Sequence, residues 1–112
     1  MSYTNKIKWE ALRTLTAAFS GSYQAVGGPL LFPSYILKLV NNSTVLVTVS
    51  IDGISDIDVA PSNSFWLYDE GKVHTSSQIP AIEKGTQIYI KGTGGTGSVY
   101  LVSQYIQHIG AL

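Results

Sequence analysis

"TVLVTVSIDGISDIDV" (residues 44–59) is the stretch of sequence that decides the fold class. Valine or isoleucine stands at every second position from 45 to 51, which is the period of a β-strand with one buried face. Asp52-Gly53 then interrupts the pattern, and this dipeptide is typical of the type I′ turn of a β-hairpin. Alternation resumes over residues 54–59, so the stretch predicts two antiparallel strands joined by a tight turn.

Asp52, Asp56 and Asp58 also raise the alternative of a cation-binding loop. A calcium loop of the EF-hand type needs the pattern Asp-x-Asp-x-Asp-Gly and a glutamate at its twelfth position. Here glycine follows the first aspartate directly, and the twelfth position is Asn63. We therefore favour the hairpin and predict no metal site.

Most of the remaining chain reads as short β segments separated by turn residues. Residues 11–19, "ALRTLTAAF", also fit a helical face, but Thr14, Thr16 and the nearby Gly21 favour a strand. The other expected strands are residues 22–26, 35–42, 64–69, 72–79, 86–91 and 97–109. About eight short strands without a credible long helix predict an all-β fold, an antiparallel β-sandwich that is jelly-roll-like or a small barrel.

The length of 112 residues predicts one compact domain. We expect residues 1–20 to form an N-terminal arm or a first strand, and residues 21–112 to form the sandwich. An arm that contains Trp9 could order by docking on a neighbouring molecule, and a frayed end is the alternative.

Charge is scarce and balanced, with seven basic and seven acidic side chains and 12% charged residues, against about 25% in typical soluble domains. Nucleic-acid binding normally needs a clustered basic face, so we expect no nucleic-acid partner. Low net charge favours association, which makes a homo-oligomer the expected state. No segment has the length of a membrane span or the features of a signal peptide, so we expect synthesis in a cytoplasm and no membrane partner.

Two stretches could suggest catalysis. Residues 91–98, "KGTGGTGS", lack the lysine that follows the glycines of a phosphate-binding loop and lead into a strand, so they predict a flexible β–β connection. His74 and Asp69 could form a triad on paper with Ser76 or Ser77, but no Gly-x-Ser-x-Gly motif accompanies them. The chain has no cysteine and only two histidines, which leaves no catalytic or zinc-binding set. We predict no enzymatic activity and no cofactor.

Aromatic side chains on the expected strands are the remaining candidates for function, because tyrosine and tryptophan favour interfaces. On residues 64–69 we expect Phe65 and Leu67 to face the core, and Trp66 and Tyr68 to face a neighbouring subunit. The interface candidates are Trp9, Trp66, Tyr68, Tyr89, Tyr100 and Tyr105.

The order of turn and strand landmarks resembles that of small virion structural proteins of tailed bacteriophages. The pattern has an early Y-x-x-V/L-G-x-P, a V-x-V-S-x-D-G hairpin, an LYD, a G-T-x-I-Y-V/I-K strand and a closing G-x-V-Y-x-x-x-x-Y. It spans about residues 20 to 105. Its landmarks here are Tyr23, Gly27, Pro29, Asn41, Asp52, Gly53, Pro61, Tyr68, Asp69, Gly85, Thr86, Tyr89, Lys91, Gly97 and Tyr100.

The resemblance implies a non-enzymatic β-sandwich subunit present in many copies in a virion. Such a subunit would act as a capsid decoration protein or as a head–tail, neck or tail adaptor, with capsid, portal or tail proteins as partners. The alternative is a module that binds a glycan or a host surface, with Trp66, Tyr68 or Tyr100 as stacking platforms.

Overall fold

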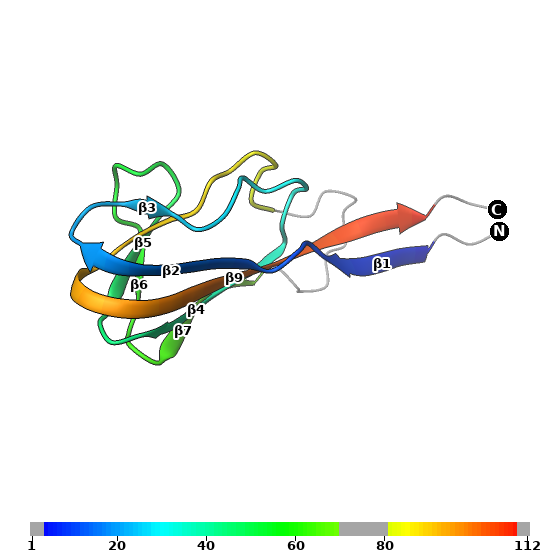
Figure 1. Ribbon diagram of the computed structural model, residues 1–112. Coiled ribbons are helices and arrows are strands. Elements are labelled where there is room, and N and C mark those ends of the chain that lie inside the picture. The colour runs from blue at the N-terminus through cyan, green and yellow to red at the C-terminus, as the bar shows by residue number, and fades with distance from the viewer. Residues whose placement is uncertain (1–3, 70–80, 110–112) are drawn as a thin grey trace.

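The computed structural model describes residues 4–69 and 81–109. The fold is all-β, with two antiparallel sheets packed face to face, which confirms the predicted sandwich. Figure 1 shows the two layers. The expected strand at residues 72–79, and with it His74, lies outside the described residues.

The large sheet has five strands in the order β1-β9-β4-β7, and β2 pairs with the same strand β9. The small sheet has four strands in the order β3-β8-β5-β6. The strands of the large sheet are β1 (Thr4–Trp9), β2 (Arg13–Ser20), β4 (Ile36–Ser43), β7 (Ser64–Asp69) and β9 (Thr93–Ile109), and those of the small sheet are β3 (Gln24–Ala25), β5 (Val47–Ser50), β6 (Asp58–Ala60) and β8 (Tyr89–Lys91).

Segment 11–19 is therefore a strand, as predicted, and not a helix. Of residues 1–20, which were expected to form an arm or a first strand, the described part forms β1 and β2. Both pair with β9, β1 along its C-terminal half and β2 along its N-terminal half.

The core lies between the sheets. The alternation of the opening stretch predicts Val47 and Val49 correctly, whereas Val45 is only partly buried and Ile51, beyond the end of β5, is 44% exposed. Val47 and Val49 of β5 are fully buried, as are Leu37 and Leu39 of β4, which face them from the other sheet. The complete buried cluster is Phe19, Val26, Leu30, Leu37, Leu39, Val47, Val49, Ala60, Ile88, Ile90, Val99 and Leu101.

The turn between β5 and β6 differs from the prediction. The two strands pair, but β6 begins only at Asp58, and residues 51–57 form a wider loop. Gly53 has a positive φ of 74° whereas Asp52 does not, which excludes a type I′ turn. The Asp52 carboxylate instead accepts hydrogen bonds from the backbone N–H groups of Ile54 and Ser55, each at 2.8 Å. These side-chain bonds replace the backbone turn that the Asp-Gly pair predicts.

The glycine-rich run at residues 91–98 is also different, because it is strand and not a flexible connection. From Thr93 onward it belongs to β9 and pairs with β2. The glycines allow a close approach to the neighbouring chain. A Cβ atom at Gly97, where φ is 138°, would lie 2.6 Å from Cα of Ser43, and one at Gly95 would lie 2.5 Å from Cγ2 of Val45.

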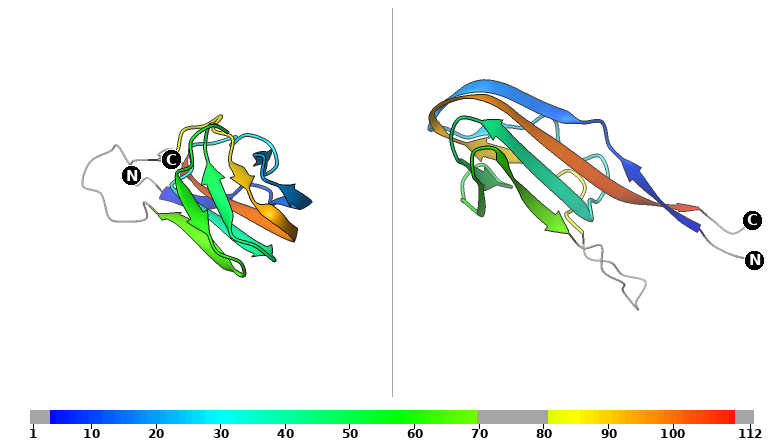
Figure 2. Two further views of the ribbon diagram at one scale, coloured as in Figure 1. Left: turned by 90° about the vertical axis from the view of Figure 1, so that its left-hand side faces the viewer. Right: turned by 90° about the horizontal axis from the view of Figure 1, so that it is seen from below.

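The molecule is elongated, with principal extents of 56 × 22 × 22 Å. Pairing of β4 with β9 ends at the Ile36–Gln104 pair, whereas β1 pairs with β9 from Gln104 to Ile109. We call β1 and residues 105–109 of β9 the ribbon. In Figures 1 and 2 this two-stranded ribbon projects beyond the sandwich.

Candidate functional site

The outer face of the small sheet is covered by its own chain. Tyr89 and Lys91 of β8 point away from the core, because they alternate along the chain with Ile88 and Ile90, which are buried. The loop of residues 51–57 lies over them. Asp56 forms an ion pair with Lys91 at 3.0 Å, and Gly53 lies against the ring of Tyr89. The loop therefore covers this face, and its own Ile51, Ile54 and Ile57, together with Val59 of β6, are exposed.

The outer face of the large sheet is different, because no described segment covers it. One cross-strand row joins Thr14, Tyr100, Val40 and Phe65, and the next row joins Val102, Lys38 and Leu67. Phe65 is 55% exposed and Leu67 is 45% exposed. We define the outer face as Trp9, Ile36, Lys38, Val40, Phe65, Leu67, Asp69, Tyr100 and Val102, and its charged side chains are Lys38 and Asp69.

The apolar surface continues from the outer face onto the ribbon. Trp9 lies opposite Gln104 and is 62% exposed. Two residues before it, Ile7 lies opposite Ile106 and is also exposed, and the strand period puts it on the same face as Trp9. Contiguous exposed apolar patches of this kind are typical of protein–protein contact sites. The sandwich and the ribbon thus share one continuous apolar surface.

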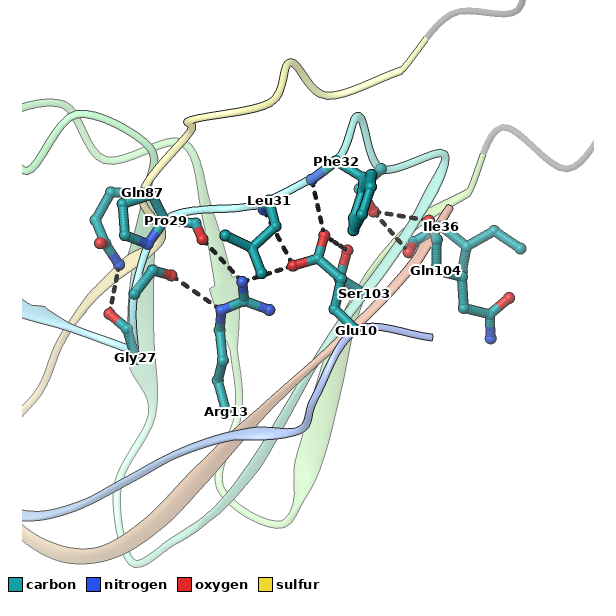
Figure 3. A network of polar contacts seen from close by, with 12 residues as sticks. Glu10, Arg13, Gly27, Pro29, Leu31, Phe32, Ile36, Gln87, Ser103 and Gln104 are labelled. Carbon is teal, nitrogen blue, oxygen red and sulfur yellow. Dashed lines mark hydrogen bonds and ion pairs between the residues drawn. The ribbon is translucent and has the colours of Figure 1, made fainter. Parts of the chain in front are cut away.

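A buried carboxylate joins the ribbon to the sandwich, at the point where β1 ends (Figure 3). The side chain of Glu10 is only 1% exposed and pairs with Arg13 at 2.7 Å. It also accepts hydrogen bonds from the backbone N–H groups of Leu31 and Phe32, at 3.1 and 3.2 Å. Because a buried charge needs such partners, Glu10 holds the segment of residues 29–33, β1 and β2 in one arrangement.

Arg13 extends this junction toward the turn after β3. Its guanidinium donates to the carbonyl oxygens of Gly28 at 2.9 Å and Pro29 at 2.8 Å. Gly27 lies directly over the Arg13 side chain, and a Cβ atom there would be 2.7 Å from Cγ of Arg13. The glycine, at φ 68°, is therefore required both by the backbone conformation and by the packing of the arginine.

An aromatic stack supports the ribbon on the side opposite to Trp9. The rings of Phe32 and Tyr105 are stacked, with centroids 4.0 Å apart and planes inclined by 10°. Tyr105 is the first residue of β9 beyond its pairing with β4. The stack therefore fixes the direction in which the ribbon leaves the sandwich.

The structure places the six predicted interface residues at four different locations. Trp9 and Tyr100 lie on the outer face, and Tyr105 lies in the stack at the base of the ribbon. Tyr89 lies beneath the loop of the small sheet. Trp66 and Tyr68 are half-buried and pack against the core.

The predicted orientation of β7 is therefore wrong. Phe65 and Leu67 were expected in the core and are exposed, whereas Trp66 and Tyr68 were expected outside and face inward. The Nε1 atom of Trp66 donates to Asp58 at 2.7 Å, which gives the large indole a polar partner at the edge of the core. All four side chains are apolar or aromatic, so hydrophobic alternation contained no signal for the phase of this strand.

The described part of the chain shows neither a metal-holding cluster nor a membrane-spanning helix. Residues 4–69 and 81–109 contain no cluster of three or more histidine, cysteine or carboxylate side chains that could hold a metal ion. No helix among them is long and apolar enough to span a membrane. His108 belongs to β9.

Comparison with known proteins does not assign the chain to a family. No protein-family model matches the sequence, and a search of curated proteins finds no significant match.

Proposed function

We propose that this chain is a non-enzymatic structural subunit that acts through repeated protein–protein contacts. The observation that supports this function best is the largely apolar outer face of the large sheet, which is continuous with the ribbon and contains two charged side chains of opposite sign, Lys38 and Asp69. The equal numbers of basic and acidic residues keep repulsion between copies small.

We further propose that the assembly is the virion of a tailed bacteriophage, with capsid, portal or tail proteins as partners. The resemblance over residues 20 to 105 is the reason for naming this particle. A bare sheet face suits a capsid decoration protein, which lies flat on a lattice. A projecting ribbon suits an adaptor of the head–tail junction, neck or tail, which reaches a neighbouring subunit.

The test uses virions that contain a charged substitution on the outer face. Leu67→Glu introduces a carboxylate into the proposed contact, opposite Lys38, where burial of the resulting ion pair against an apolar partner surface carries a desolvation cost. We expect its copy number in purified particles, measured by quantitative mass spectrometry, to fall at least tenfold. Ile54→Glu is the matched control, because Ile54 is 82% exposed and belongs to the loop on the small sheet.

Electron microscopy with an antibody against the chain locates the subunit in the same particles. Density on the capsid surface supports the decoration role, and density at the neck or tail supports the adaptor role. Absence of the chain from purified virions, or equal incorporation of the two variants, contradicts the proposal.

A glycan-binding module is the second candidate, and one observation favours it. Trp9 is 62% exposed and lies opposite the amide side chain of Gln104, a pair that could stack on a sugar ring and bind its hydroxyl groups. Retention of the purified chain on a polysaccharide column, and loss of retention in Trp9→Ala, would support this function over the structural one.

A further inference from the structure

One backbone edge of the ribbon, along β9, pairs with no strand among residues 4–69 and 81–109. Within residues 4–69 and 81–109, β4 covers this edge only as far as Gln104, whose carbonyl oxygen also accepts hydrogen bonds from the backbone N–H of Tyr35 and the hydroxyl of Ser34. Beyond Gln104 no described strand pairs with that side of β9. Of the strands that the structure describes, only β1 therefore pairs with residues 105–109.

The direction of the backbone groups on this edge follows from the ladder. The N–H of Glu10 donates to the carbonyl of Ser103, so the odd-numbered residues of this half of β9 face β1. The N–H of Thr44 donates to the carbonyl of Thr96, so the even-numbered residues face β4. The N–H and C=O groups of Ile106 and His108 therefore point to the free edge.

A two-stranded ribbon is at best marginally stable in water, and three or more strands are needed for an independent sheet. An added strand would satisfy the free backbone groups of Ile106 and His108 and widen the sheet. β-strand addition of this kind is a common mode of protein recognition.

We propose that the added strand is β9 of a second copy of this chain, antiparallel and related by a two-fold axis at Gln107. The free edge runs from residue 105 to residue 109, and Gln107 is its centre. In this register Ile106 of each copy pairs with His108 of the other, and each such pair exchanges two backbone hydrogen bonds. A two-fold axis makes the edge complementary to itself.

The charges of the two ribbon strands favour β9 over β1 for this contact. Residues 104–109, QYIQHI, contain no lysine, arginine, aspartate or glutamate, so two copies can approach without repulsion. β1 contains Lys6 and Lys8, and lysines on an edge strand are a common means of preventing self-association. The alternative pairing of β1 with β1 would bring these like charges close together.

The pairing deepens the proposed structural function and rests on it for the view that the ribbon serves protein contact. The axis is perpendicular to the joined sheet, so the outer faces of both copies lie on the same side. A dimer formed in this way presents one apolar surface of twice the extent to the next component of the assembly.

A single cysteine tests the register, because the native chain contains none. At the proposed axis the two copies of residue 107 form a non-hydrogen-bonded pair with Cα atoms about 4.5 Å apart, which suits a disulfide. We expect Gln107→Cys to give a disulfide-linked dimer on mild oxidation, resolved on a non-reducing gel. His108→Cys is the register control, because its two copies are offset by two positions along the strands and lie too far apart to bond.

A proline pair tests the edge without relying on cysteine. His108→Pro removes an N–H from the free edge of β9 and leaves the bonds to β1 in place, whereas Asn5→Pro removes one from the opposite edge of the ribbon. Sedimentation equilibrium of the full chain should show a monomer–dimer equilibrium. We expect its dissociation constant to rise at least tenfold in His108→Pro and to stay within twofold of the native value in Asn5→Pro.

The proposal is overturned by a native chain that stays monomeric, by equal crosslinking of the two cysteine variants, or by an effect of Asn5→Pro that matches or exceeds that of His108→Pro. These outcomes differ from a failure of the proposed function. A chain that stays monomeric yet is incorporated into virions through Leu67 contradicts the pairing alone, whereas a chain that dimerises but is absent from virions contradicts the function alone.

Discussion

Up to Gln104, β9 lies between two strands, and beyond Gln104 its one partner in the described part of the chain is β1. In the first half, Leu101 is fully buried between the sheets, and both edges of the strand are bonded, to β2 and to β4. In the second half, Ile106 lies in a two-stranded ribbon beside the exposed Ile7. One continuous strand thus belongs to a packed core and to a surface that is suited to a partner. Stability should follow this division, because burial is the main source of stabilisation.

Removal of the carboxylate that joins the two regions should have the largest effect. Glu10→Ala leaves Arg13, which is only 10% exposed, without its ion pair, and leaves the N–H groups of Leu31 and Phe32 without an acceptor. Loss of one partner of a buried pair costs about 4 kcal/mol. Urea unfolding followed by circular dichroism measures the change in the free energy of unfolding. Glu83→Ala is the control, and an effect as small as that of this exposed residue would mean that Glu10 does not stabilise the junction.

Matched truncations in the two halves of β9 test the division directly. Leu101→Ala should lower the free energy of unfolding by about 3 kcal/mol, because it creates a cavity at a fully buried site. Ile106→Ala should cost about 1 kcal/mol or less in the monomer, because its side chain is only half-buried. The same urea experiment, performed at low protein concentration, compares the two. Equal losses would show that the ribbon is as well packed as the core.

Amide hydrogen exchange should resolve the same difference without mutation. Amides of β9 that are bonded to β4, such as that of Val102, should exchange only on global opening. Amides bonded to β1 within the ribbon, such as that of Gln107, should exchange at least tenfold faster through local opening. Exchange measured by NMR at low protein concentration gives both rates. Equal protection along the whole strand would contradict a division at Gln104.

Titration of Asp52 in the loop over the small sheet should have the smallest effect of the four. Hydrogen bonds from the N–H groups of Ser55 and Ile54, and then from the Ser50 hydroxyl, lower the pKa of Asp52 from 3.8 to about 2. A depressed native pKa contributes stability above the unfolded value, and this is lost as the pH falls from about 4 toward 2. Asp52→Asn should lack this step when the free energy of unfolding is measured against pH. An identical profile in the native chain would exclude the role of the carboxylate.

Strand prediction succeeded where only one face of a strand is apolar, and it failed where both faces are. In β5 the valines alternate with threonine and serine, and the predicted Val47 and Val49 are in the core. In β7 the residues from Phe65 to Tyr68 are all apolar or aromatic, so either face of the strand fits the hydrophobic pattern of a buried face equally well. The prediction chose the wrong face. The residues missed on the outer face, Phe65 and Leu67, were hidden by that ambiguity.

Glycine and aspartate were read as local turn signals, and tertiary contacts changed their role. The glycines of residues 91–98 serve close approach to Ser43 and Val45, which are distant in sequence. The Asp-Gly pair is part of a loop that closes over Tyr89 and Lys91 of another strand. Neither contact can be seen from a window of neighbouring residues.

The sequence by itself determined the all-β class, the buried face of β5 and the weak charge of the chain, because period-two alternation and composition are local properties. Only the tertiary structure decided which face of β7 is exposed, why Glu10 is buried, and where β4 stops along β9. Each of these depends on pairing between segments that are far apart in the chain, and the position of that last pair, Ile36 with Gln104, leaves the ribbon with a free edge.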